Sequence, residues 1–193
     1  MLDLPRAQEA LPDIPDWWPV WHGKTCVIVA GGPSAKDQPF DLLKKTRTKI
    51  IAVNNAHELV PKADVLFACD LSWWRKYGPG LKFKGLRLST DKNACEPLNQ
   101  WGVKRVMLER PSDKLVLTGY NKVGWGGNSG FQALNLAVLF GCSKIILVGY
   151  DMTTSNGLHW HGAHPPGMNN PTEGNIKRWR NAVDAAADQI EPL

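Results

Sequence analysis

The chain has 193 residues, of which 43% are hydrophobic and 21% are charged, and its formal net charge is +5. This length suits one well-cored domain and excludes two ordinary ones, while the mild positive charge favours an anionic small ligand and does not exclude nucleic acid. No apolar stretch is long enough to span a membrane. Acidic residues and prolines interrupt the N-terminus where a secretion signal needs an apolar core, so we expect a cytoplasmic protein.

Residues 1–22 are expected to form an N-terminal arm rich in tryptophan and proline, and residues 23–193 a single domain. The arm contains the motif DWWPVWH at Asp16–His22. Its tryptophans either clamp the arm onto the domain or form a stacking platform for a sugar or base. The four cysteines include no close pair of the type that binds zinc, and they are expected to be small buried hydrophobes.

Continuous apolar runs separated by helical stretches are typical of buried parallel strands. Strands are predicted at Thr25–Ala30, Lys49–Val53, Val65–Cys69, Gly85–Leu88, Val103–Leu108 and Lys144–Val148. Helices are predicted at Pro39–Lys45, at Ser129–Phe140, at Thr172–Gln189, and in a short stretch through Trp73 and Tyr77 that Ser72 caps. Pro111–Gly127 is expected to be a loop. The pattern predicts an α/β Rossmann-like three-layer sandwich with a mostly parallel sheet. Because such sheets often add a strand after the last helix, we expect the natural chain to continue beyond Leu193.

The loop after the first strand, Gly31-Gly32-Pro33-Ser34, is a candidate ligand-binding turn. Glycines allow close approach to a ligand, and backbone amides can hold phosphate. The loop lacks the third glycine of the dinucleotide fingerprint and the Lys-Ser/Thr ending of a phosphate loop, so an ordinary tight turn is the alternative.

Polar residues also follow the second and third strands. Asn54 and Asn55 end one of them, and Asp70 ends the other. Such groups are placed to contact ribose hydroxyls or base edges. The two asparagines alternatively make a simple turn, and Asp70 alternatively holds Mg²⁺ through water.

A second junction begins with Asn128-Ser129-Gly130, at the start of the strongest predicted helix. Free amides and the positive end of the helix suit an anion, although Ser129 is also placed as an ordinary N-cap. Asp151 follows the next strand, so parallel geometry brings it to the same edge of the sheet.

Three of the five histidines, His159, His161 and His164, follow in a polar loop at about residues 153–170 that is rich in glycine and proline. Three interpretations stay open from spacing alone. The histidines form a metal site, they lie on a mobile lid that carries a general base, or they are plain surface residues.

The segments VIVAGGPSAKD, IAVNNA, the strand ending in Asp70, and SGFQALNLAVLFGCSKIILVGYDM together resemble one superfamily. It comprises the bacterial α-2,3-sialyltransferases of glycosyltransferase family 42 and the related domain-of-unknown-function-115 group, which includes 6-hydroxymethylpterin diphosphokinases. The chain is most similar to small phage and prophage members. The resemblance covers about residues 25–152.

The resemblance implies that the cytidine monophosphate part of a donor lies against the glycine loop, Asn54, Ser129 and Gly130. It also implies that a lid histidine, here assigned to His161, acts as base on the acceptor hydroxyl. Cys69-Asp70 departs from the sialyltransferase pattern, because an acid there repels a bare phosphate unless a cation bridges them. That departure favours the diphosphokinase branch.

The resulting hypothesis is a nucleotide-dependent, glycosyltransferase-like transferase that uses a nucleotide or nucleotide-sugar donor, of the cytidine type, and an unknown acceptor. A Mg²⁺-dependent diphosphokinase-like transferase is the first alternative. The second is a non-enzymatic phage structural or host-interaction protein that retains the fold.

Overall fold

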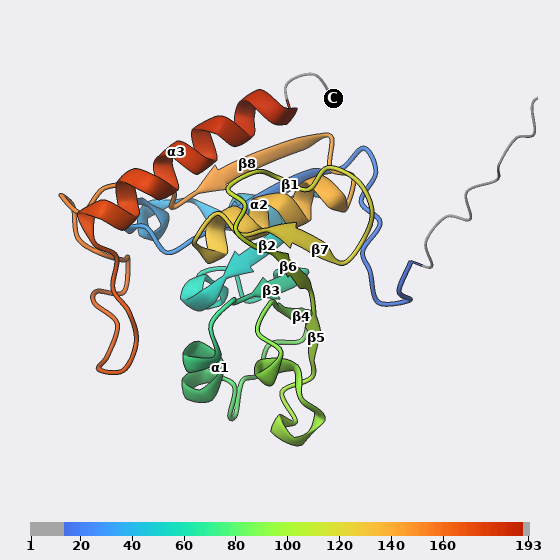
Figure 1. Ribbon diagram of the computed structural model, residues 1–193, viewed down its shortest axis with the longest axis horizontal. Helices are drawn as coiled ribbons and strands as arrows, with labels where there is room; N and C mark the ends of the chain where they lie inside the picture. The colour runs from blue at the N-terminus through green and yellow to red at the C-terminus, as the bar shows by residue number, and fades with distance from the viewer. Residues whose placement is uncertain (1–13, 191–193) are drawn as a thin grey trace, which may run out of the picture.

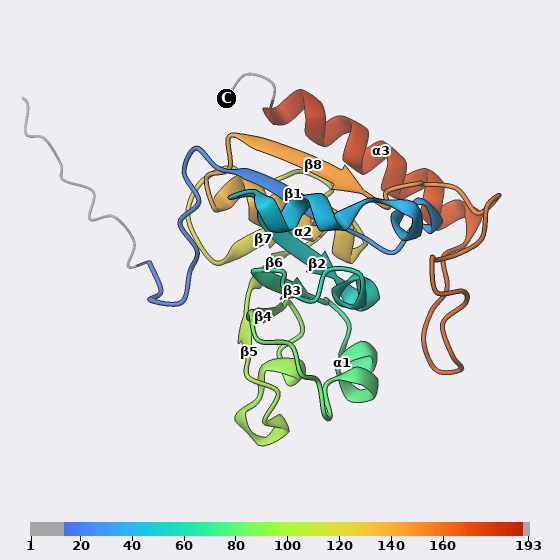
Figure 2. The ribbon, with the colours of Figure 1, turned by 180° about the vertical axis from the view of Figure 1, so that it is seen from behind.

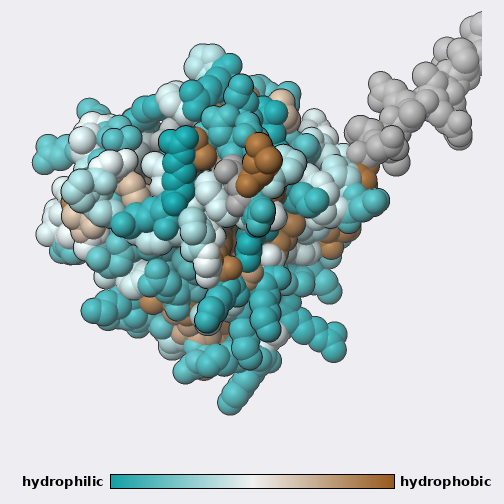
Figure 3. Space-filling model, turned by 90° about the horizontal axis from the view of Figure 1, so that it is seen from below, coloured by the Kyte–Doolittle hydropathy of each residue, from teal (hydrophilic) through white to brown (hydrophobic). Residues whose placement is uncertain are grey.

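The computed structural model describes residues 14–190, and the expectations for residues 1–13 of the arm lie outside this range (Figure 1). Within it, no helix combines the length and the apolar character that crossing a membrane requires. The face seen in Figure 3 is mostly hydrophilic, and brown hydrophobic residues gather there only in small groups.

A six-stranded sheet with the order β5-β4-β3-β2-β1-β8 forms the centre of the domain. All of its neighbouring pairs are parallel. The strands are β1 (Thr25–Val29), β2 (Lys49–Val53), β3 (Val65–Phe67), β4 (Leu86–Ser89), β5 (Val103–Arg105) and β8 (Lys144–Val148). The predicted α/β Rossmann-like class with a parallel sheet is therefore confirmed.

Helical layers cover both faces of this sheet (Figures 1 and 2). On one face, Cys26 and Ile28 of β1 pack with helices α2 (Ser129–Leu139) and α3 (Glu173–Ile190). On the other, Val27 and Val29 pack with α1 (Leu71–Tyr77) and three short 3-10 helices. The latter are η1 (Pro33–Asp37), η2 (Phe40–Lys45) and η3 (Asn54–Glu58). Alternate residues of one strand thus supply two separate cores, as in a three-layer sandwich.

The single strand predicted at Val103–Leu108 is wrong, because this segment joins two different sheets. The amide of Val106 donates to the carbonyl of Ser89 at 2.8 Å, and the next amide, of Met107, donates to the carbonyl of Asn121 at 2.7 Å. The chain therefore leaves the main sheet at Val106 and starts β6 (Met107–Glu109), which pairs in parallel with β7 (Lys122–Gly124). Strand β7 lies inside Pro111–Gly127, the segment expected to be a loop. It was missed because three residues are too few to show a strand pattern.

Two predicted helix caps are also corrected. Asn128, not Ser129, caps α2, because its Oδ1 accepts the amide of Phe131 at 2.9 Å. The N-cap position of α1 is Asp70, so Ser72 already lies inside that helix. The cap of α2 therefore lies one residue, and that of α1 two residues, before the predicted cap.

The described part of the arm clamps onto the domain. Trp18 and Trp21 are 5% and 6% exposed, and their rings meet Phe140 edge-on with centroids 4.9 and 4.8 Å away. The amide of Trp21 also donates to the carbonyl of Phe140. Because these two rings are buried in the core, they are not available to stack on a sugar or base.

Candidate functional site

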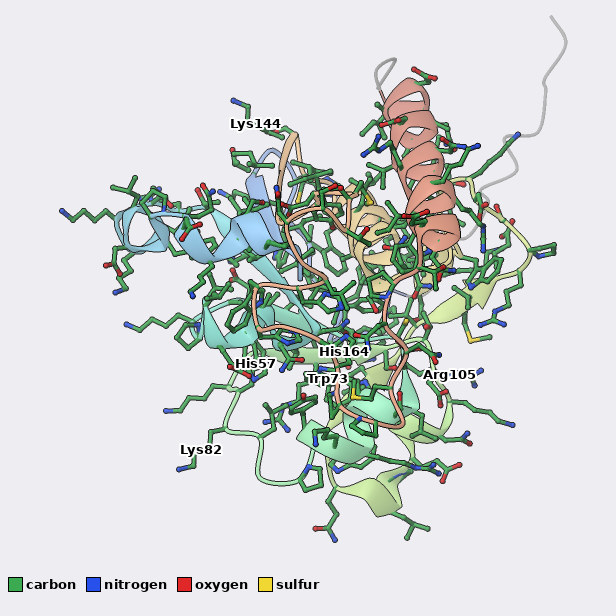
Figure 4. The ribbon with its side chains drawn as sticks, turned by 90° about the vertical axis from the view of Figure 1, so that its left-hand side faces the viewer. His57, Trp73, Lys82, Arg105, Lys144 and His164 are labelled. Atoms are coloured by element: carbon green, nitrogen blue, oxygen red, sulfur yellow. The ribbon has the colours of Figure 1, made fainter. Side chains whose placement is uncertain are left out.

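The fold creates a crevice where the strand order reverses. Strands β2 to β5 extend the sheet on one side of β1, whereas β8 pairs with its other side. After β1 the chain continues to η1 on one face of the sheet, and after β8 it continues to α3 on the other face. The carboxyl ends of two such adjacent parallel strands are the place where ligands bind in open α/β sheets. A crevice of about 820 Å³ opens there. Figure 4 looks onto this edge, with the loop of residues 153–170 running across it.

The crevice brings together nearly all of the residues that the sequence singled out. Its lining includes Gly31, Gly32, Pro33, Asn54, Asp70, Asn128, Ser129, Gly130, Asp151, His159, His161 and His164. Ser34 is the exception and does not line it. Asn55, next to Asn54, has a structural role, because its buried amide joins Trp73 Nε1 to Glu58.

The glycine loop is joined directly to the loop after β8. The Asp151 carboxylate accepts the Ser34 amide at 3.1 Å and the Ser34 hydroxyl at 2.8 Å, and the Gly32 amide donates to the Gly149 carbonyl at 2.9 Å. A Cβ at Gly32 would lie 2.0 Å from Asp151 Oδ2, so only glycine fits. Two of the amides expected to hold phosphate are thus already bonded within the protein.

Asn54 lines the crevice, and its side chain contains an unpaired acceptor. It has a left-handed φ of 52° at the end of β2, a conformation that asparagine tolerates better than most residues. Its carbonyl contacts His57 Nδ1 at 2.9 Å, but its side-chain Oδ1 is buried with no hydrogen-bond partner in the structure. A buried acceptor without a donor is destabilising, so this atom is placed to receive a donor group from a ligand.

The start of α2 offers backbone donors to the same crevice. Asn128 satisfies the amide of Phe131, but the amides of Ser129 and Gly130 precede the first intrahelical hydrogen bonds. The Ser129 hydroxyl is already engaged, since it accepts the Cys69 amide at 3.2 Å and contacts Cys69 Sγ at 3.0 Å. Ser129 therefore joins α2 to the segment that follows β3, and its backbone amide, not its hydroxyl, is the group left to bind an anion.

Basic and aromatic residues that the sequence analysis missed complete the lining. Lys92, Arg105 and Arg110 contribute positive charge, and Trp125 contributes a ring that also contacts the Arg110 guanidinium at 5.3 Å from its centroid. Arg105 is labelled in Figure 4, to one side of His164. Arg105 is the last residue of β5, but the single strand predicted at Val103–Leu108 hid that strand-end position.

The three histidines of the loop after β8 meet in the crevice. Their ring centroids are 5.1 Å apart for His159 and His161, 4.4 Å for His159 and His164, and 5.3 Å for His161 and His164. The loop is attached to the domain because the Trp160 amide donates to the Gly31 carbonyl at 2.9 Å. All three side chains are partly buried and line the crevice, and the interpretations as a metal site, as a lid that carries a base and as plain surface residues stay predictions.

Burial lowers the pKa of all three imidazoles. The pKa of His159 falls to about 4, first because of burial and then because His164 and His161 disfavour another positive charge beside them. The rings are therefore neutral near pH 7, and each keeps one nitrogen lone pair. Burial likewise raises the pKa of the Cys69 thiol and of the Tyr150 hydroxyl, so the latter stays protonated and donates to the Gly130 carbonyl at 2.9 Å.

No protein-family model, curated protein or solved structure matches this chain. A function can therefore be inferred only from the geometry of the crevice and the residues that line it.

Proposed function

We propose that this protein is a nucleotide-dependent transferase of the glycosyltransferase-like type, with the donor nucleotide in the crevice at the carboxyl ends of β1, β2 and β8. The observation that carries the proposal is the convergence, at one switch point, of an unpaired buried acceptor on Asn54 and free amides at the start of α2. Dinucleotides and mononucleotides bind at this point in open parallel sheets.

The two features suit the two ends of a nucleotide. The amides of Ser129 and Gly130, with the positive end of α2, attract phosphate. Arg105 and Arg110 add the positive charge that a diphosphate or nucleotide-sugar needs. Asn54 Oδ1 then accepts a hydrogen bond from a ribose hydroxyl or a base amino group. The glycine loop positions Asp151 and shapes this side of the crevice. Its Gly32 and Ser34 amides are already bonded within the protein, so they are not assigned to the phosphate.

The acceptor side of the proposed reaction lies at the histidine cluster. The family resemblance assigns the base to His161, which would take the proton of the acceptor hydroxyl as the phosphate-linked group leaves the donor. Both His161 and Asn54 line the crevice, so a donor and an acceptor fit within one site.

A Mg²⁺-dependent diphosphokinase-like transferase is a second candidate, and Asp70 favours it. Its exposed side chain lines the crevice, and it makes no capping hydrogen bond to α1. An exposed carboxylate beside a phosphate site is a typical Mg²⁺ ligand.

A thermal-shift panel of nucleotides, with and without Mg²⁺, tests these proposals. A nucleotide at 100 times its Kd stabilises the folded state by about 2.7 kcal/mol, which raises Tm by about 5–11 °C for a chain of this size. Stabilisation by cytidine nucleotides without metal supports the glycosyltransferase-like function, and stabilisation by a triphosphate only with Mg²⁺ supports the diphosphokinase. No response to any nucleotide contradicts both and favours the non-enzymatic alternative.

The variant Asn54→Gly sharpens this test. Glycine adopts the φ of 52° without strain and removes the unpaired Oδ1, so the variant should fold and melt normally. Its nucleotide-induced shift should nevertheless be lost. Asn181→Ala, on the exposed side of α3, is the matched control and should respond like the wild type. An unchanged shift in Asn54→Gly would show that Asn54 does not contact the ligand.

A further inference from the structure

The histidine cluster contains more imidazoles than proton transfer requires. A general base needs one imidazole, whereas His159, His161 and His164 bring one nitrogen each to within 4.8 Å of one another. All three come from one loop segment and line the same crevice. Three imidazoles grouped this closely are a typical donor set for a transition-metal ion.

Two of the ring nitrogens are buried without any hydrogen-bond partner in the structure. They are Nε2 of His159 and Nδ1 of His164. Leaving a buried polar atom unpaired costs about 1–3 kcal/mol, so a native site with two such atoms in one histidine cluster calls for an occupant. A metal ion would satisfy both lone pairs at once.

The other side of the His159 ring is held as in known metal sites. Its Nδ1 faces Gly31, where an added Cβ would lie only 3.0 Å away, and the ring hydrogen-bonds to the Gly31 backbone. Metal-binding histidines characteristically use the second ring nitrogen for a bond to a backbone carbonyl or a carboxylate, which directs the first nitrogen at the metal. This arrangement leaves Nε2 of His159 directed into the cluster.

The surroundings favour a cation. The Asp70 carboxylate is close enough to His164 to interact with it electrostatically, and Glu58 interacts in the same way with His161. A hydrogen bond from the His164 amide to Asn170 Oδ1, at 2.7 Å, holds the loop backbone in place beside the cluster. The basic residues that line the crevice, Lys92, Arg105 and Arg110, belong to other segments than the histidine loop.

We propose that His159, His161 and His164 bind one divalent transition-metal ion, with Zn²⁺ the best match. Nitrogen ligands in a tetrahedral zinc site are about 3.3 Å apart for Zn–N bonds of about 2.05 Å, so the rings need to approach by up to about 1.5 Å. Side-chain rotation in a glycine- and proline-rich loop allows this. Three protein ligands leave one coordination position for water or for an oxygen of a bound molecule.

This inference does not depend on the proposed nucleotide chemistry. It differs from the Mg²⁺ alternative, because imidazole nitrogens suit zinc and related ions while Mg²⁺ prefers oxygen. A nitrogen that ligates the metal cannot also accept a proton. With the ion bound, a metal-bound hydroxide, formed when a coordinated water loses a proton to solvent, would be the base in place of His161.

The test titrates chelator-treated protein with Zn²⁺ by calorimetry, and with Co²⁺ by visible absorption, with no nucleotide present. We expect one ion per chain and the intense d–d bands of four-coordinate cobalt without a thiolate charge-transfer band, which excludes the free cysteines as ligands. Loss of an outer partner of a metal ligand typically weakens binding 10- to 100-fold, so loss of a ligand itself should weaken it by at least about 100-fold.

His159→Ala, His161→Ala and His164→Ala should each show this loss, and His22→Ala, an exposed histidine outside the crevice, should bind like the wild type. Circular dichroism melts of the metal-free variants show whether each is folded, and His161→Asn provides a second, more conservative change. Absence of saturable binding at one equivalent overturns the proposal. So does one-to-one binding that survives both His159→Ala and His164→Ala. The nucleotide panel is a separate readout, so failure of either proposal leaves the other interpretable.

Discussion

Substitution of Asn135 should destabilise this protein more than most single substitutions do. It lies in the middle of α2 and is fully buried. Its Oδ1 accepts the amides of Val116 at 2.9 Å and Gly124 at 2.8 Å, and its Nδ2 donates to the carbonyl of Val116 at 2.7 Å. One side chain thus holds the segment before the crevice residue Trp125 against the helix.

The change Asn135→Ala removes one acceptor that serves two amides and one donor that serves a carbonyl. Each buried group left unpaired costs about 1–3 kcal/mol, and partial entry of water reduces the sum, so we expect a loss of about 4 kcal/mol in the free energy of unfolding. Domains are stable by about 5–15 kcal/mol in total, so this loss is a large fraction. In a chain of this length it should lower Tm by about 8–16 °C.

Urea denaturation followed by circular dichroism measures this loss by linear extrapolation. Asn181→Ala on the exposed face of α3 is the control and should stay within about 0.5 kcal/mol of the wild type. A loss below about 1 kcal/mol for Asn135→Ala would refute the reasoning, because it would mean that the three hydrogen bonds are replaced at little expense.

Two further changes test the packing around the crevice and the arm. Gly32→Ala places a Cβ 2.0 Å from Asp151 Oδ2, so it should separate the two loops and lower both Tm and nucleotide affinity. In α3, a Cβ at Gly174 would meet only Thr172 Oγ1, at an ordinary contact distance of 3.9 Å, so Gly174→Ala should be neutral or stabilising. Equal melting of the two variants would contradict the steric argument. Trp18→Ala should destabilise by about 3–5 kcal/mol, and Val20→Ala, 59% exposed, by far less; similar urea midpoints for both would show that the arm does not clamp the core.

Much of the fold could be read from local patterns. Continuous apolar runs predicted β1, β2 and β8 to within a residue at each end. Strands covered on both faces need apolar side chains at nearly every position, and the partly exposed edge strand β8 has the same kind of apolar run. Parallel strands share one carboxyl edge, and the residues after those strands accordingly lie around one crevice. Short elements such as β6 and β7 were not predicted correctly, because three residues show too little pattern to distinguish a strand from a loop.

The chemistry of the crevice depended on contacts between distant segments. The glycine loop contains no local sign that Asp151 occupies the Ser34 amide, because the two residues are 117 positions apart. Likewise, the spacing of the histidines left three interpretations open, and only the loop path placed their nitrogens within 4.8 Å of one another. Local sequence sets which backbone conformations and buried faces are favoured. Which polar atoms find partners, and which are left unpaired for a ligand, depends on strand register and rotamers that only the packed chain specifies.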